Sequence, residues 1–163
     1  KSKISNKEQG ENISLQLKEN IKEQSDNISF KPKEITAASP SLEEIKYLIN
    51  TWLFNKSTYL AGKSEINLSK IAKEGLIKRT IEQRQNDIKK GTYKDITSQI
   101  QKIDLLSQNS SRIVVLVELN YSESILKNSG ELINEKSFTP LKVKYILGFS
   151  KKSWKLADFV SGL

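Results

Sequence analysis

The side chains that could do chemistry in this chain are carboxylates, lysines and tyrosines, because histidine and cysteine are both absent from its 163 residues. The usual general base, the thiol nucleophile and the commonest metal ligand are therefore missing. A carboxylate such as Glu118 or Asp158 could act as a base, with the Tyr145 hydroxyl donating to an oxyanion. No spacing pairs these groups, so we interpret Glu118 as a residue of an outer strand face and Asp158 as a cap at a sheet end. The sequence predicts no enzyme, no cofactor and no metal site, and it has no G-x-G-x-x-G or P-loop motif.

Lysines give the chain a formal net charge of +8, which predicts a cationic face. Five lysines and no acid lie within residues 142–155. Such a face suits an acidic protein tail, lipid headgroups or nucleic acid. Nucleic acid is disfavoured, because only two arginines lie in the basic stretches, including residues 63–102, and no stacking or reader motif accompanies them. The alternative is a generic solubilising surface, in which Lys142 and Lys144 discourage unwanted edge pairing of their strand.

In the strands that would position these groups, apolar and polar residues alternate, which is a period of two. Alternation over residues 141–149 predicts a strand with one buried face, made of Leu141, Val143, Tyr145, Leu147 and Phe149. The short turn over residues 150–153 returns the chain as an antiparallel strand over residues 154–160. Two further strands are predicted over residues 93–106 and 112–124. The chain should therefore end in a four-stranded, mostly antiparallel sheet.

Helical patterns precede these strands. A capping box of Ser41 and Glu44 opens a helix that extends toward Gly62. A short second helix is predicted over residues 68–73, and a third over residues 76–90. Three helices followed by a meander predict an α+β domain in which the helices pack on one face of the sheet.

Residues 1–40 differ in composition from the rest of the chain. Seven lysines and six acids nearly cancel, and Phe30 is the only aromatic residue, so this segment buries too little apolar surface to offset its ordering entropy. We predict a disordered linker over residues 1–40 and one folded domain over residues 41–163. Because the chain begins at Lys1, we expect it to be a piece of a longer protein. No window reaches the roughly 18 apolar residues of a membrane span.

Two motifs carry a resemblance to a known family. The first helix has the pattern W-x3-K-x3-L-x-G, and the last hairpin has V-K-Y-x-L followed by W-K-L. These motifs lie at Trp52, Lys56, Leu60 and Gly62, at Val143, Lys144, Tyr145 and Leu147, and at Trp154, Lys155 and Leu156. Together they resemble the IMS-type domain that closes the plastid-division protein named for accumulation and replication of chloroplasts, and its cyanobacterial relative ZipN. The resemblance covers residues 42–160.

The resemblance implies a cone-shaped fold similar to nuclear transport factor two. It also implies a non-enzymatic protein-interaction domain at the end of a membrane-anchored cell-division scaffold that acts at the septum. A transmembrane helix upstream would place this domain on the periplasmic side of the inner membrane, or in the intermembrane space of a plastid. There it would bind the tail of a partner membrane protein, with residues 1–40 as a spacer. The Lys-, Asn- and Ile-rich composition suits the AT-rich genome of a small cyanobacterium.

In such a cone, Trp154 opens the last strand near the mouth, where a half-exposed aromatic could grip the end of a partner. We therefore predict Lys144, Tyr145, Trp154 and Lys155 as partner-binding residues. The alternative function is a small-molecule-binding or catalytic cone-fold domain. It requires an enclosed pocket of several hundred cubic ångströms lined by convergent polar groups.

Overall fold

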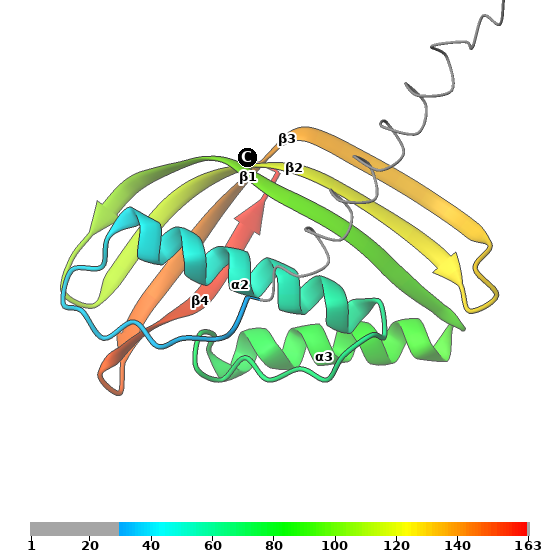
Figure 1. Cartoon of the computed structure of the whole chain (residues 1–163), viewed down its shortest axis with the longest axis horizontal. Helices are drawn as coiled ribbons and strands as arrows, with labels where there is room; N and C mark the ends of the chain where they lie inside the picture. The colour runs from blue at the N-terminus through cyan, green and yellow to red at the C-terminus, as the bar shows by residue number, and fades with distance from the viewer. Residues whose placement is uncertain (1–29, 163) are drawn as a thin grey trace, which may run out of the picture.

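The computed structural model describes residues 30–162, which form two helices and one antiparallel sheet. The elements are α2 (Leu42–Leu60), α3 (Glu74–Lys89), β1 (Thr92–Gln108), β2 (Arg112–Lys127), β3 (Leu132–Ser150) and β4 (Ser153–Ser161). The strands are hydrogen-bonded in the order β1-β2-β3-β4, which is a simple meander. The sheet curves over α2 and α3, which lie on its concave side (Figure 1). The predicted α+β architecture is confirmed, whereas the likeness to nuclear transport factor two stays a prediction.

The capping box defines the start of α2 as the sequence predicts. The Ser41 hydroxyl accepts from the Glu44 amide at 3.1 Å, and the Glu44 carboxylate accepts from the Ser41 amide at 2.8 Å. The face of α2 toward the sheet is buried at helical spacing, through Ile45, Leu48, Ile49 and Trp52. This packing fixes α2 under the middle of the sheet.

The predicted short helix over residues 68–73 is wrong, and the described residues contain two α-helices rather than three. The Ile71 and Ala72 amides both donate to the Leu68 carbonyl, which makes a single turn. The chain then pairs with the outer edge of β4, where the Leu156 amide donates to Ile71 and the Lys73 amide donates to Leu156. The apolar spacing that predicted a helix is produced here by a turn whose side chains are buried against the sheet.

The predicted domain start at residue 41 is too late, because residues 30–40 pack onto the folded domain. Ile35 is buried and pairs with Trp154, whose amide donates to the Ile35 carbonyl at 2.8 Å. The rings of Phe30 and Tyr47 lie 5.7 Å apart. A segment of polar composition is thus held by backbone pairing at a strand edge and by a few apolar anchors. The remainder of the predicted linker, residues 1–29, lies outside the described residues.

The β3–β4 hairpin has the predicted position and a tight turn. Ser150 pairs with Ser153, and the two central residues have positive φ, 51° at Lys151 and 65° at Lys152, as in a type I′ turn. Along the predicted buried face of β3, Val143, Tyr145 and Leu147 are buried and Leu141 is partly buried. Phe149 was expected there too but is 37% exposed, because it lies at the end of the strand beside the turn.

Candidate functional site

The concave face of the sheet changes character along β2, from aliphatic side chains to aromatic and charged ones. Val117 and Leu119 are buried, whereas Tyr121 and Glu123, which follow at the same spacing, carry polar groups. A register shift sets Tyr121 opposite Phe138 on β3 and leaves Thr139 and Pro140 unpaired. Because Tyr121 and Glu123 share a face with Val117 and Leu119, their polar groups face the helices.

A small cavity lies between α2 and this part of the sheet, and we call it the hollow. Its volume is about 100 Å³. Its lining side chains come from α2 and three strands, and are Trp52, Leu53, Lys56, Leu119, Tyr121, Leu141, Val143, Tyr145, Phe159 and Ser161. Most of these side chains are aromatic or aliphatic, so the hollow is an apolar slot with few polar groups.

Lys56 is the one cation in the lining of the hollow. Its Nζ lies 4.8 Å from the centroid of the Phe159 ring and 5.8 Å from that of Trp52, so two aromatic faces hold the ammonium. Burial lowers the pKa of Lys56 to about 8, against the opposing attraction of the Glu123 carboxylate. Within residues 30–162, no carboxylate lies within ion-pair distance of Lys56.

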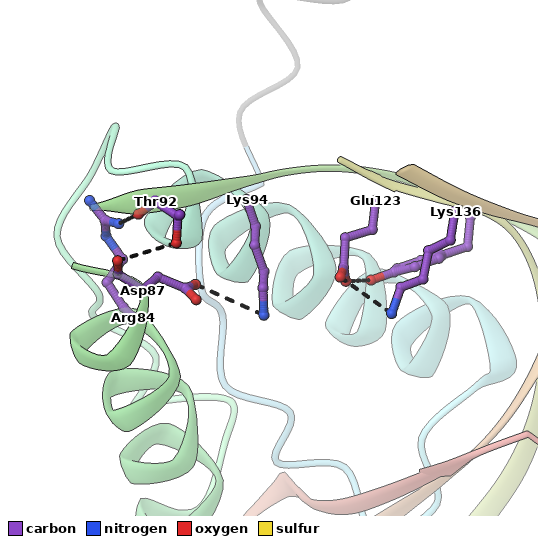
Figure 2. A network of polar contacts seen from close by, with 7 residues as sticks. Arg84, Asp87, Thr92, Lys94, Glu123 and Lys136 are labelled. Atoms are coloured by element: carbon purple, nitrogen blue, oxygen red, sulfur yellow. Dashed lines mark hydrogen bonds and ion pairs between the residues drawn. The ribbon is translucent and has the colours of Figure 1, made fainter. Parts of the chain in front are cut away.

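Glu123 is the centre of a polar cluster beside the hollow. The Tyr121 hydroxyl donates to Glu123 Oε2 at 2.7 Å, and Lys136 Nζ lies 3.3 Å from Oε1 (Figure 2). Burial acts to raise the pKa of Glu123, but the hydrogen bond from Tyr121 and the charges of Lys136 and Lys94 outweigh it and lower that pKa. Burial, together with the bond to Glu123, raises the pKa of Tyr121. At neutral pH the pair is an ionised carboxylate and a neutral phenol.

The cluster continues to the end of α3 through Lys94 and Asp87. Figure 2 shows Lys94, Glu123 and Lys136 pointing from the sheet in one direction, with Asp87 of α3 reaching Lys94. Lys94 Nζ lies 3.9 Å from Asp87 Oδ2, which is too far for a hydrogen bond. This oxygen is buried and has no hydrogen-bond partner in the described part of the chain. Positive and negative groups thus alternate along this cluster.

Phe138 contacts the lining residue Tyr121, as Glu123 does, and we call Tyr121, Glu123 and Phe138 the mouth of the hollow. The Phe138 side chain is 43% exposed, and its ring centroid lies 6.5 Å from that of Tyr121. A large aromatic surface beside a slot of aromatic and aliphatic groups is a feature of protein-binding sites.

Comparison with known protein families identifies the domain. A family model described as "ARC6-like, IMS domain" matches residues 46–157, which is more than half of the chain. The chain belongs to the ARC6-like IMS domain family.

A solved structure supports the same fold for this ARC6-like IMS domain. The crystal structure of the intermembrane space region of chloroplast protein ARC6 superposes with a TM-score of 0.61 at 14% sequence identity. The match covers 76% of this chain and 97% of that chain. No curated protein matches this sequence. None of the helices over residues 30–162 is both long and apolar enough to cross a membrane.

The four predicted partner-binding residues do not lie together in this ARC6-like IMS domain. Tyr145 lines the hollow, is 2% exposed, and packs on Phe159 with ring centroids 5.9 Å apart. Trp154 was expected to be half exposed but is fully buried, because Phe149 covers its ring and its Nε1 donates to the Ala37 carbonyl. Lys144 and Lys155 alternate with these buried residues and lie on the opposite face of the sheet. Their role in binding stays a prediction.

The candidate catalytic groups are also separated. Glu118 pairs with Lys142 on the outer face of the sheet, away from Tyr145. The Asp158 carboxylate bonds to Arg79 at 2.6 Å, and this bond lowers the pKa of Asp158. No group of three or more acidic side chains in the described residues is placed to hold a metal ion.

Sequence reasoning missed the residues that build the mouth, namely Tyr121, Glu123 and Phe138. The alternation in β2 predicts that Tyr121 and Glu123 share a face with Val117, which was a usable signal. Phe138 could not be assigned, because its position depends on the register shift at Thr139 and Pro140.

Proposed function

We propose that this ARC6-like IMS domain is a non-enzymatic protein-interaction domain of a membrane-anchored cell-division scaffold, and that its hollow binds the tail of a partner membrane protein. The observation that carries the proposal is the open aromatic mouth. Phe138 is exposed there, while Tyr121, Phe159 and Lys56 line the interior. An apolar or aromatic residue of a tail fits this slot, and charged groups at the rim bind the polar parts of the tail.

The size of the hollow favours this function over the alternative of a small-molecule site. Pockets for small molecules typically have volumes of roughly 300–1,000 Å³. The hollow has about 100 Å³, and the Glu123 carboxylate near it is already engaged by Tyr121 and Lys136. A site of this size fits one side chain of a peptide better than a whole metabolite.

The family supports an extracytoplasmic location for the domain, in the periplasm of a cyanobacterium or the intermembrane space of a plastid. Residues 1–29 would join it to an upstream membrane anchor. The domain would then meet partner tails that emerge from the same membrane near the septum.

The test is capture of extracytoplasmic tails from membrane division proteins by the immobilised 163-residue chain. The informative variant is Phe138→Ser, and its matched control is Phe54→Ser, because Phe54 is 39% exposed, packs on Phe30 and does not line the hollow. We expect Phe138→Ser to weaken binding of a captured tail at least about tenfold, and Phe54→Ser to weaken it less than about twofold. The absence of any binding tail, or equal loss in both variants, would reject the proposal. Normal septum formation after deletion of the domain would also reject it.

A further inference from the structure

A second surface lies away from the hollow, where the start of α3 meets the β3–β4 hairpin. A groove of about 590 Å³ there is lined in part by Ser69, Lys73, Glu74, Lys151 and Lys155. We call it the lysine groove. The sequence did not predict this groove, because Lys73 is far in sequence from Lys151 and Lys155.

The lysine groove has a positive charge that its own residues do not neutralise. Three lysines face one acid, Glu74, and within residues 30–162 no carboxylate forms an ion pair with Lys73, Lys151 or Lys155. Gathering like charges around one groove is unfavourable, and an anion in the groove would relieve the repulsion.

The fold fixes where these charges lie. The Lys73 amide donates to the Leu156 carbonyl at 2.9 Å, which ties its backbone to the edge of β4. The Lys73 side chain then lies against Gly148 of β3, where an added Cβ would stand 2.8 Å from Nζ. Gly148 therefore leaves the space that the Lys73 ammonium occupies.

The hairpin turn holds two lysines in a conformation that lysine rarely adopts. Lys151 and Lys152 both have positive φ, and this turn usually contains Asn and Gly at these positions. Residues kept in such conformations are often retained for function. Phe149, 37% exposed, lies just before the turn, and the hairpin projects from the body of the domain at the lower left of Figure 1.

We propose that the lysine groove and the hairpin tip bind the headgroups of anionic phospholipids at a bilayer surface. Phe149 lies on the face of the hairpin that carries Trp154, and Lys155 lies on the other face, so the tip presents an exposed aromatic on one side and lysines on the other. A projecting tip that carries both kinds of side chain is typical of contacts with an anionic membrane interface. The proposal rests on the proposed function, which keeps the domain near a membrane. An acidic protein segment would also match the charge of the groove, but it would not need a projecting aromatic.

The experiment is flotation of the 163-residue chain with vesicles of phosphatidylglycerol mixed with phosphatidylcholine, and with phosphatidylcholine alone. We expect binding to the anionic vesicles only, and weaker binding at high salt. The triple variant Lys73→Gln, Lys151→Gln and Lys155→Gln should weaken this binding at least about tenfold, since each lysine contributes to attraction.

Two further variants make the test specific to position rather than charge. The matched triple Lys63→Gln, Lys89→Gln and Lys90→Gln removes the same charge from exposed sites elsewhere and should leave binding within about twofold. Gly148→Ala retains every charge but displaces the Lys73 ammonium, so binding should weaken about two- to threefold. Circular dichroism confirms that each variant is folded.

Three results would overturn the proposal. The first is no binding to anionic vesicles, and the second is equal loss in the two triple variants. The third is binding to soluble polyglutamate but not to vesicles, which would identify an acidic protein as the ligand. The Phe138→Ser variant should bind vesicles normally, and the double variant Lys73→Gln and Lys151→Gln should capture tails normally, so failure here is distinguishable from failure of the proposed function.

Discussion

The concave face of the sheet has two halves built from the same strands, and their contents differ. In the half near the β3–β4 hairpin, Ile113, Leu147, Trp154 and Leu156 are fully buried. In the half at the hollow, the same alternation presents phenols, a carboxylate and ammonium groups. Burying charged groups beside a slot lowers stability relative to aliphatic packing. The first half therefore contributes more to the stability of the fold, and the second is the half in which we propose that a partner binds.

The largest effect is expected from Trp154→Ala in the aliphatic half. Removing this fully buried ring should lower the free energy of unfolding by about 3–5 kcal/mol. Phe138→Ala, in the other half, should lower it by less than about 1 kcal/mol, because Phe138 is exposed. Urea unfolding of both variants measures the difference, and equal losses would remove the distinction between the two halves.

Lys56→Met should stabilise the fold at pH 7, because it replaces a partly buried, desolvated charge by an apolar side chain of similar length. The pKa of Lys56 is lowered from 10.5 to about 8 in the folded state, so folding disfavours the charged form. The gain should be on the order of 2–3 kcal/mol at pH 7.

The pH dependence of this gain has a definite sign. Between pH 8 and 10.5 the folded protein loses the Lys56 proton while the unfolded chain retains it, so the wild-type chain gains stability and the advantage of the variant shrinks. Unfolding of both proteins from pH 7 to 9.5 measures it. Lys63→Met, at an exposed lysine, is the control and should show no such trend. A pH-independent difference for Lys56→Met would mean that this lysine is not buried as described.

Glu123→Gln should have a smaller effect than Lys56→Met, a loss of about 1 kcal/mol at pH 7. The pKa of Glu123 lies below its ordinary value of 4.5 in the folded state, so its stabilising contribution is present above pH 4.5 and is lost as pH falls through the folded pKa. Unfolding at pH 7 and pH 3 should therefore show a smaller difference between the proteins at pH 3 than at pH 7. The absence of any difference at pH 7 would show that the polar cluster contributes nothing to stability.

The elements with strong local signals could be predicted from the sequence. The Ser41 capping box and the alternation along β2 and β3 define α2 and the sheet because these patterns act within a few residues. The β3–β4 hairpin follows from the same short-range pattern. The antiparallel meander follows from the short turns, because a parallel return would need a long crossover connection.

The hollow and the environment of Trp154 could not be predicted, because both depend on pairing between distant segments. Residues 30–37 have a polar composition, yet their backbone pairs with β4 and covers Trp154. The mouth depends on a register shift that pairs Tyr121 with Phe138. Neither contact has a local pattern that would identify it.

The most direct test of the account is mapping of a captured partner tail on the isotope-labelled chain by amide chemical shifts. We predict that the changes gather at residues of the hollow and its mouth, namely Lys56, Tyr121, Phe138 and Phe159, and leave Leu116 and Lys142 on the outer face unchanged. Changes confined to the outer face of the sheet, with the hollow silent, would contradict the account.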